Sequence, residues 1–198
     1  MIGPAEREKR VPYSIASAPA ETRTSGRLDF LIKIESSGRW GRQFDAIQQG
    51  DRLGVDGPFG SFLFPSQPRE QRFLFIAGGT GIAPIRAMIQ QAALTGVPGQ
   101  MKLLYSAKTA DDFAYLPELR ELAAQRGLSL RLYVTRETTA TESEHFARGR
   151  ISIAQIAPLV DDPATLCFVC GPESMVDAVP QMLLELGIER ARIRLEEW

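Results

Sequence analysis

The sequence has little of several features that each indicate a particular class of protein. Among its 198 residues are two cysteines and one histidine, too few for an iron–sulfur cluster or a histidine-rich metal site. A formal net charge of −1 provides no excess of positive charge for nucleic acid or an anionic membrane. No apolar run approaches the about 20 residues that cross a bilayer, and the opening MIGPAEREKR is not a secretion signal. We therefore expect a globular, cytoplasmic protein that binds neither nucleic acid nor membrane.

The two cysteines, Cys167 and Cys170, have the CxxC spacing of redox disulfides and zinc sites. They lie in the apolar run LCFVCGP, which predicts a buried strand, and residues three apart on a strand point to opposite faces. A disulfide would require that strand to bend. Zinc would require further ligands, and the single histidine, His145, lies in a polar stretch far from the two cysteines in sequence. We favour a plain buried strand, without a metal, over either alternative.

Apolar runs and turn residues divide the chain at a proline-rich passage, residues 58–68. Three antiparallel strands are expected before it, and they cannot close a small barrel, which takes roughly six to eight. We therefore predict a first domain over 1–68 that is an incomplete antiparallel β-barrel. Its expected elements are strands over 11–17, 27–35 and 52–57 and a short helix over 41–49.

Beyond Arg69 the pattern changes to an alternation of strands and helices. Such alternation predicts a parallel sheet with helices on both faces. The second domain, 69–198, is therefore expected to be an α/β nucleotide-binding domain. Its expected elements are strands over 72–77, 101–107, 129–135, 165–170 and 191–195 and helices over 82–94, 117–126, 152–159 and 173–186.

The segment IAGGTGIAP, residues 76–84, joins the first of these strands to the first helix. Gly79, Gly81 and Pro84 form a GxGxxP variant of the dinucleotide-binding fingerprint, in the strand–helix context that the motif requires. Glycines there let the backbone approach a pyrophosphate, whose charge is stabilised at the helix N-terminus. Proline suits the first helical turn. The segment predicts an NAD(P)-binding turn, and a glycine-rich turn without a ligand is the alternative.

A second glycine motif follows the strand over 165–170. It consists of Cys170, Gly171 and Pro172, with Met175 on the next helix. Ligands of open α/β sheets bind along the carboxyl edge of the strands, so this motif is expected to face the same crevice as the first. The alternative is a strand end followed by a proline that starts a helix.

Five segments follow one another along nearly the whole chain: PYSIAS, GPFGSF, GGTGIAP, CGPESM and the terminal LEEW. Together they resemble the ferredoxin:NADP reductase family of flavoenzymes. The resemblance implies a flavin-binding barrel, an NAD(P)-binding domain, and the cofactors FAD and NADP or NAD.

The resemblance also implies flavin contacts near the N-terminus. Tyr13 and Ser14 match the pair that holds the isoalloxazine ring, with Ser14 near the ring atom that receives hydride. Ser17, in the same run, is assigned to this site. The family usually has an arginine two residues before the tyrosine, where this chain has Val11. The family's second flavin-phosphate motif falls on GRWG and assigns Arg39 and Gly41 to the phosphates, with Gly41 in place of a Ser or Thr.

The end of the chain matches the family's terminal acid-x-aromatic. Trp198 would cover the flavin, and the carboxylate of Glu196 would relay a proton. Thr80 would lie beneath the nicotinamide. Cys170 would join Ser14 and Glu196 as the catalytic residues at the point of hydride transfer.

Binding of the adenosine ribose is implied for five further residues. Arginine forks suit the 2′-phosphate of NADP, and no acid that would favour NAD stands at the end of the second strand. Ser152 replaces a tyrosine that stacks on adenine in the family. We favour NADP over NAD, with solvated surface charges as the alternative. The five residues are Ser106, Lys108, Thr135, Arg136 and Arg150.

The leading hypothesis is an NAD(P)H-dependent reductase that passes electrons to a ferredoxin, flavodoxin or oxygenase component. Two alternatives stay open: a reductase that releases reduced free flavin, and a non-catalytic nucleotide-binding subunit. Family members carry several dozen residues before the tyrosine–serine pair, whereas this chain has twelve before Tyr13. We therefore expect that Met1 is an internal methionine of a longer reading frame.

Overall fold

The computed structural model describes residues 1–4, 11–34, 44–136 and 146–197. Its centre is a six-stranded sheet in which every neighbouring pair is parallel, in the order β6-β5-β4-β3-β7-β8. The predicted α/β fold class is thereby confirmed. The strands are β3 (Arg72–Gly78), β4 (Gln100–Ala107), β5 (Ser129–Val134), β6 (Ala147–Arg148), β7 (Leu166–Gly171) and β8 (Ile193–Glu197).

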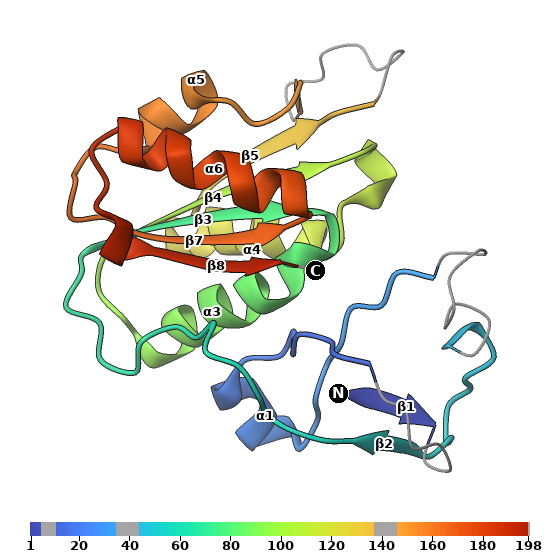
Figure 1. Cartoon of the computed structure of the whole chain (residues 1–198). Coiled ribbons are helices and arrows are strands. Elements are labelled where there is room, and N and C mark those ends of the chain that lie inside the picture. The colour runs from blue at the N-terminus through green and yellow to red at the C-terminus, as the bar shows by residue number, and fades with distance from the viewer. Residues whose placement is uncertain (5–10, 35–43, 137–145, 198) are drawn as a thin grey trace.

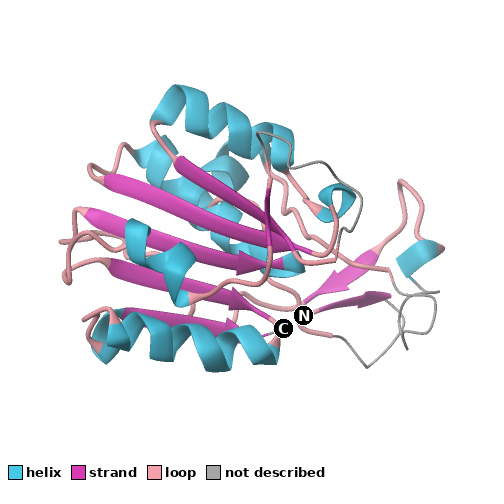
Figure 2. Ribbon diagram, turned by 90° about the horizontal axis from the view of Figure 1, so that it is seen from above, coloured by secondary structure: helices cyan, strands magenta, loops and turns pink. Residues whose placement is uncertain are grey.

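Helices cover both faces of this sheet, as Figures 1 and 2 show. On one face, α3 (Ile82–Thr95) and α4 (Leu116–Arg126) enclose an apolar core that includes Phe75, Tyr105 and Phe168. On the other face lie α5 (Ile153–Ile156), the 3₁₀ turn η3 (Ala157–Leu159) and α6 (Glu173–Glu185). The central strands β3 and β7 are buried on both faces, which explains their nearly continuous apolar sequences. Further 3₁₀ turns are η1 (Gly79–Gly81), η2 (Ala110–Asp112) and η4 (Arg190–Arg192).

The two cysteines lie on β7 with their side chains on opposite faces, as the strand spacing predicts. Cys170 belongs to the core beneath α3, and Cys167 belongs to the core beneath α6. Both thiols are free and buried, and burial raises the pKa of Cys167 to about 12. Among the described residues, no group of three His, Cys, Asp or Glu side chains could hold a metal ion.

The first part of the chain is organised differently from the prediction. Strand β1 (Ile2–Pro4) pairs antiparallel with β2 (Leu53–Val55), and these two form a sheet of their own. The strands expected over 11–17 and 27–35 are wrong as continuous elements, since the described residues there contribute only the single bridges Ile2↔Val11 and Ile15↔Phe30. An extended segment forms a regular strand when a ladder of consecutive hydrogen bonds joins it to a neighbour, and these two segments make isolated bridges in place of a ladder.

A short helix, α1 (Pro19–Ser25), lies between these bridges and was not expected. Proline occupies its first turn, and Gly26 ends it in the left-handed conformation (φ 68°). The helix expected over 41–49 falls partly outside the described residues, within which 44 and 45 are helical. The β region therefore does not close into a barrel in the described part of the chain, in agreement with the expected incomplete barrel.

The loop between β2 and β3 packs onto the parallel sheet. The ring of Phe64 lies 5.1 Å from that of Phe73 on β3 and 5.8 Å from that of Phe168 on β7, measured between centroids. Phe62 contacts Phe168 in the same way, at 6.0 Å. The boundary predicted between residues 68 and 69 lies in this loop. None of the helices in the described ranges has both the length and the apolar character that a bilayer crossing requires.

Candidate functional site

The first glycine motif forms a tight turn at the carboxyl edge of the sheet. Strand β3 ends at Gly78, the turn η1 follows, and α3 begins at Ile82. A Cβ on Gly81 would lie 2.3 Å from the carbonyl oxygen of Cys170, so the turn packs directly on β7 with no room for a side chain. Gly79 has a φ of 53°, which glycine adopts readily. Pro84 lies in the first turn of α3, as expected.

The second glycine motif meets the first. A Cβ on Gly78 would lie 2.7 Å from Cε of Met175, and one on Gly171 would lie 2.6 Å from its Sδ. Pro172 is likewise 3.0 Å from the position of a Cβ on Gly78. The structure therefore brings both predicted motifs to one place, with backbone amide groups of η1 and the N-terminus of α3 beside them.

A buried tyrosine supports the turn from below. The hydroxyl of Tyr105 donates to the carbonyl oxygen of Gly79 at 3.1 Å and accepts from the amide of Ala114 at 3.2 Å. Burial raises the pKa of Tyr105, so its hydroxyl stays protonated and keeps donating. The sequence alone does not single out Tyr105, because a tyrosine in an apolar strand has the same pattern as an ordinary core residue.

Three predicted catalytic side chains come together where the two parts of the chain meet. Strands β7 and β8 place Cys170 opposite Glu196. The hydroxyl of Ser14 donates to Oε2 of Glu196 at 2.8 Å, and the thiol of Cys170 lies 4.0 Å from that same oxygen. Burial, and then the charge of Glu196, raise the pKa of Cys170. The thiol is therefore a neutral group and not a nucleophilic thiolate.

The remaining flavin-site candidates lie around Ser14. Tyr13 is half-buried, its ring contacts that of Phe44 edge-on at 5.5 Å between centroids, and burial raises its pKa. The buried hydroxyl of Ser17 shares a hydrogen bond of 3.0 Å with Thr22 and accepts from the amide of Asp29 at 3.1 Å. These contacts order the local backbone, and a cofactor contact of Ser17 stays a prediction. Arg39, Gly41 and Trp198 lie outside the described residues.

The candidates for the adenosine end lie at the carboxyl ends of β4, β5 and β6. The amide of Thr135 donates to the carbonyl oxygen of Ala107 at 3.0 Å, and that of Arg136 donates to the carbonyl oxygen of Lys108 at 2.9 Å. The segments after β4 and β5 therefore run side by side, with Lys108 and Arg136 exposed. Ser106 is buried within β4, and Arg150 is exposed just after β6.

Comparisons with known proteins agree with this arrangement. Residues 75–181 match the model of an oxidoreductase NAD-binding domain, and residues 4–64 match that of an oxidoreductase FAD-binding domain. Ferredoxin--NADP reductase B of Sorangium cellulosum is 30% identical over 199 residues, which cover 96% of this chain and 79% of that protein. The reductase component of propane 2-monooxygenase from Rhodococcus jostii is also 30% identical, over 94% of this chain and 50% of that protein.

A solved structure shares the fold. It is a ferredoxin NADP+ reductase from Neisseria gonorrhoeae with bound FAD and NADP, which superimposes with a TM-score of 0.75 at 23% identity, over 93% of this chain and 78% of that one. The two glycine turns and the Ser14–Glu196–Cys170 group lie at the same carboxyl edge of the sheet.

Proposed function

Because the chain belongs to the ferredoxin:NADP reductase family, we propose that this oxidoreductase transfers hydride from NADPH to FAD and then electrons, one at a time, to a separate redox protein or oxygenase component. The observation that supports this best is the carboxylate oxygen that Glu196 shares between Ser14 and Cys170, beside the glycine turns. Hydride transfer requires the nicotinamide and flavin rings to meet. Ser14, Cys170 and Glu196 come together where the flavin half meets the nucleotide-binding sheet.

The residues present fit a dinucleotide. Side chains on Gly78, Gly81 or Gly171 would collide with Met175 or with the backbone of β7, so glycine at these positions is what lets the two turns pack together. The amide groups of η1 and the N-terminus of α3 would hold the pyrophosphate. Thr80, half-buried in the turn, would lie beneath the nicotinamide.

The catalytic group acts through hydrogen bonding. Ser14 would turn its hydroxyl from Glu196 toward the reacting ring, and a proton that moves between Glu196 and the ring would pass through this hydroxyl, which gives up one proton as it accepts another. Glu196 would relay protons between solvent and the junction, since it is only half-buried. Cys170 would supply a neutral, polarisable contact to the ring. Tyr13, and beyond the described residues Trp198, would bind the two faces of the flavin, with Arg39 and Gly41 at its phosphates.

We further propose a preference for NADPH over NADH. Lys108 and Arg136 are exposed on adjacent segments, and Arg150 follows the neighbouring strand. Guanidinium groups bind a phosphate monoester through paired hydrogen bonds. Thr135 would add a hydroxyl and Ser106 would support the segment from within β4. The domain ranges 1–68 and 69–198 and the cytoplasmic location stay predictions from the sequence.

Anaerobic mixing of purified protein, loaded with FAD, with NADPH or with NADH tests the proposal. We expect the flavin absorbance to bleach with both nucleotides, at a lower half-saturating concentration for NADPH. Reduction of free flavin by protein that retains none would indicate a flavin reductase instead. Absence of bleaching with both nucleotides would contradict the proposed activity.

A further inference from the structure

Arg86, on the second turn of α3, is a charged residue inside an apolar helix. Its exposed fraction is only 5%, whereas the charged residues of α4 are mostly exposed. The guanidinium forms a forked pair with Glu118 on α4, with Nε–O distances of 2.8 and 3.0 Å and an Nη2–O distance of 2.8 Å. It also lies 4.7 Å from the ring centre of Tyr115. These contacts fix Arg86 within the α/β half of the chain, residues 69–198.

The rest of the guanidinium contacts the flavin half of the chain, residues 1–68. Nη1 donates to the carbonyl oxygen of Ala16 at 2.7 Å. Nη1 and Nη2 also lie 3.4 and 3.5 Å from the carboxylate of Glu21 on α1, and Asp29 is 3.7 Å away. One side chain therefore holds groups from both halves of the chain.

The group held most closely lies next to the candidate site. Ala16 is two residues beyond Ser14 on the same segment, and Arg86 is on the helix that begins at the end of the glycine turn. We propose that Arg86 is a positioning residue that sets the distance between the flavin-binding segment and the nicotinamide-binding turn. This inference rests on the proposed function, because that distance matters only if hydride crosses the junction.

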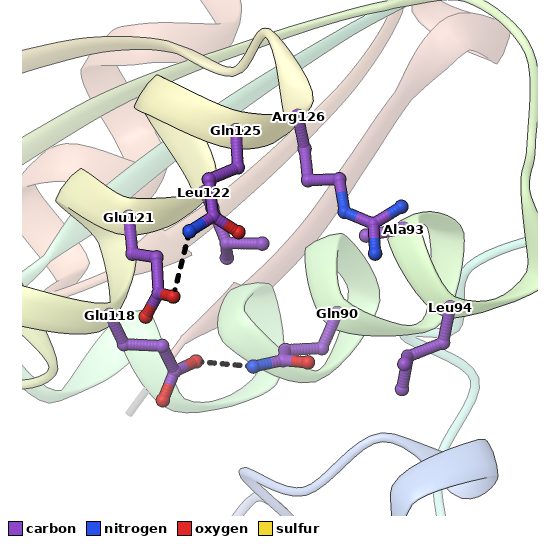
Figure 3. Close-up of a pocket in the computed structure, with 8 residues that line it drawn as sticks. All are labelled: Gln90, Ala93, Leu94, Glu118, Glu121, Leu122, Gln125 and Arg126. Carbon is purple, nitrogen blue, oxygen red and sulfur yellow. Dashed lines mark hydrogen bonds between the residues drawn. The ribbon is translucent and has the colours of Figure 1, made fainter.

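The neighbours of Arg86 are themselves held in place. Glu118 accepts a further hydrogen bond, from Nε2 of Gln90 at 2.6 Å, which Figure 3 shows beside a surface hollow between α3 and α4. On the opposite side, Oε1 of Gln91 accepts from the amide of Ala20 at the start of α1 at 2.9 Å. Gln90 and Gln91, which are consecutive residues of α3, therefore hydrogen-bond to Glu118 in the α/β half and to α1 in the flavin half.

Arginine suits this task because its planar group carries several donors in fixed directions. A carbonyl oxygen and two carboxylates are bound from one rigid fork, so small rotations of one half against the other would break several hydrogen bonds at once. Displacement of reacting atoms by about 1 Å can lower a rate about a hundredfold. A side chain that limits such displacement acts on the rate while leaving nucleotide affinity unchanged.

The test compares Arg86→Gln and Arg86→Lys with Arg126→Gln, which removes an exposed arginine of α4 that lines the hollow in Figure 3. Stopped-flow measurement at saturating NADPH gives the rate of flavin reduction, and calorimetric titration gives the Kd for NADP+. We expect Arg86→Gln to slow reduction about tenfold or more, with the Kd changed less than about twofold. Arg86→Lys should recover part of the rate, and Arg126→Gln should match the parent chain.

Amide hydrogen exchange provides a readout that needs no turnover. In Arg86→Gln, residues 13–20 should exchange faster while β3 and β4 keep their protection. If Arg86→Gln does not fold, Glu21→Gln removes a contact from the flavin half alone and should slow flavin reduction about threefold.

The outcomes separate this inference from the proposed function. Unchanged reduction rates and unchanged exchange at 13–20 in Arg86→Gln, or in Glu21→Gln where only that variant folds, would overturn the positioning role. A parent chain that NADPH does not bleach would contradict the proposed function, and the exchange data would still show whether Arg86 joins the halves. A large increase in the Kd for NADP+ in Arg86→Gln would also overturn the inference, because it would indicate a damaged turn.

Discussion

The α/β half of the chain buries a six-stranded sheet on both faces, whereas the described part of the flavin half pairs three residues of β1 with three of β2. The α/β half has its own apolar core on each face of the sheet. Three hydrogen-bonded contacts join the flavin half to the α/β half: Ser14 with Glu196, Ala16 with Arg86 and Ala20 with Gln91. The comparison indicates that a few polar contacts on one large core determine the geometry of the site.

The largest expected effect comes from the apolar contact of the connecting loop. Phe64→Ala removes a ring that packs on Phe73, Phe75 and Phe168, and should lower the free energy of unfolding by about 3 kcal/mol. Phe59→Ala is the matched control, because Phe59 is 73% exposed and its loss should change stability by less than about 0.5 kcal/mol. Urea denaturation measures both variants. Equal effects would show that the loop does not belong to the core of the α/β half.

A second substitution tests the turn by itself. Gly81 has ordinary helical dihedrals, so Gly81→Ala introduces no backbone strain but places a Cβ against the carbonyl of Cys170. We expect a loss of about 2 kcal/mol and a higher Kd for NADP+, since η1 must move away from β7. Gly96→Ala provides the opposite case, with a φ of 65° and open space around the Cβ. It should cost about 1 kcal/mol and leave the Kd unchanged. Equal Kd values in both variants would contradict the role of the close packing.

The same contrast between halves explains what could be predicted from sequence. The apolar runs that became β3, β4, β5 and β7 are buried on both faces, and local sequence alone identifies such strands. Strand β6 has two residues, both exposed, and carries no apolar signal. Helix α1 buries none of its residues, so it has no apolar periodicity. Its only signals were Pro19 at the start and Gly26 at the end.

The site divides in a similar way. The glycine turns and the Ser14–Glu196–Cys170 group could be predicted, because each lies in a short motif whose place in the fold is fixed. Arg86 and Tyr105 could not, since their roles depend on residues distant in sequence that only the folded chain brings together. A lone arginine inside the apolar helix sequence IAPIRAMIQ was the one signal available for Arg86.

A smaller effect tests whether Tyr105 supports the turn. Tyr105→Phe leaves the carbonyl of Gly79 and the amide of Ala114 without this partner and should lower the free energy of unfolding by about 1 kcal/mol. Tyr133→Phe is the control, because Tyr133 is a half-buried tyrosine on the neighbouring strand β5. Thermal unfolding, with and without NADP+, measures the change. A shift that is equal in the two variants would contradict support of the turn by the Tyr105 hydroxyl.

The smallest expected effect lies at the amino edge of the sheet, away from the flavin half. Asp161 accepts from Nζ of Lys102 at 2.9 Å and lies 3.3 Å from Nε of Arg72. The hydrogen bond from Lys102 holds the pKa of Asp161 below its ordinary value. Because Asp161 is exposed to solvent, Asp161→Asn should cost only about 0.5 kcal/mol at neutral pH.

The pH dependence gives this last prediction its sign. A carboxyl group whose pKa is lower in the folded chain contributes stability above its ordinary pKa of about 4, and loses that contribution as the pH falls through the folded value. The difference between the parent chain and Asp161→Asn should therefore be present at neutral pH and disappear in acid. Asp177→Asn, at an exposed position on α6, should show no such difference. Exchange at residues 13–20 should stay unchanged in both, because contacts at this edge are not those that order the flavin half. Faster exchange at residues 13–20 in Asp161→Asn would instead mean that any loss of stability in the α/β half increases exchange in the flavin half. That result would contradict a specific role of the contacts at the junction.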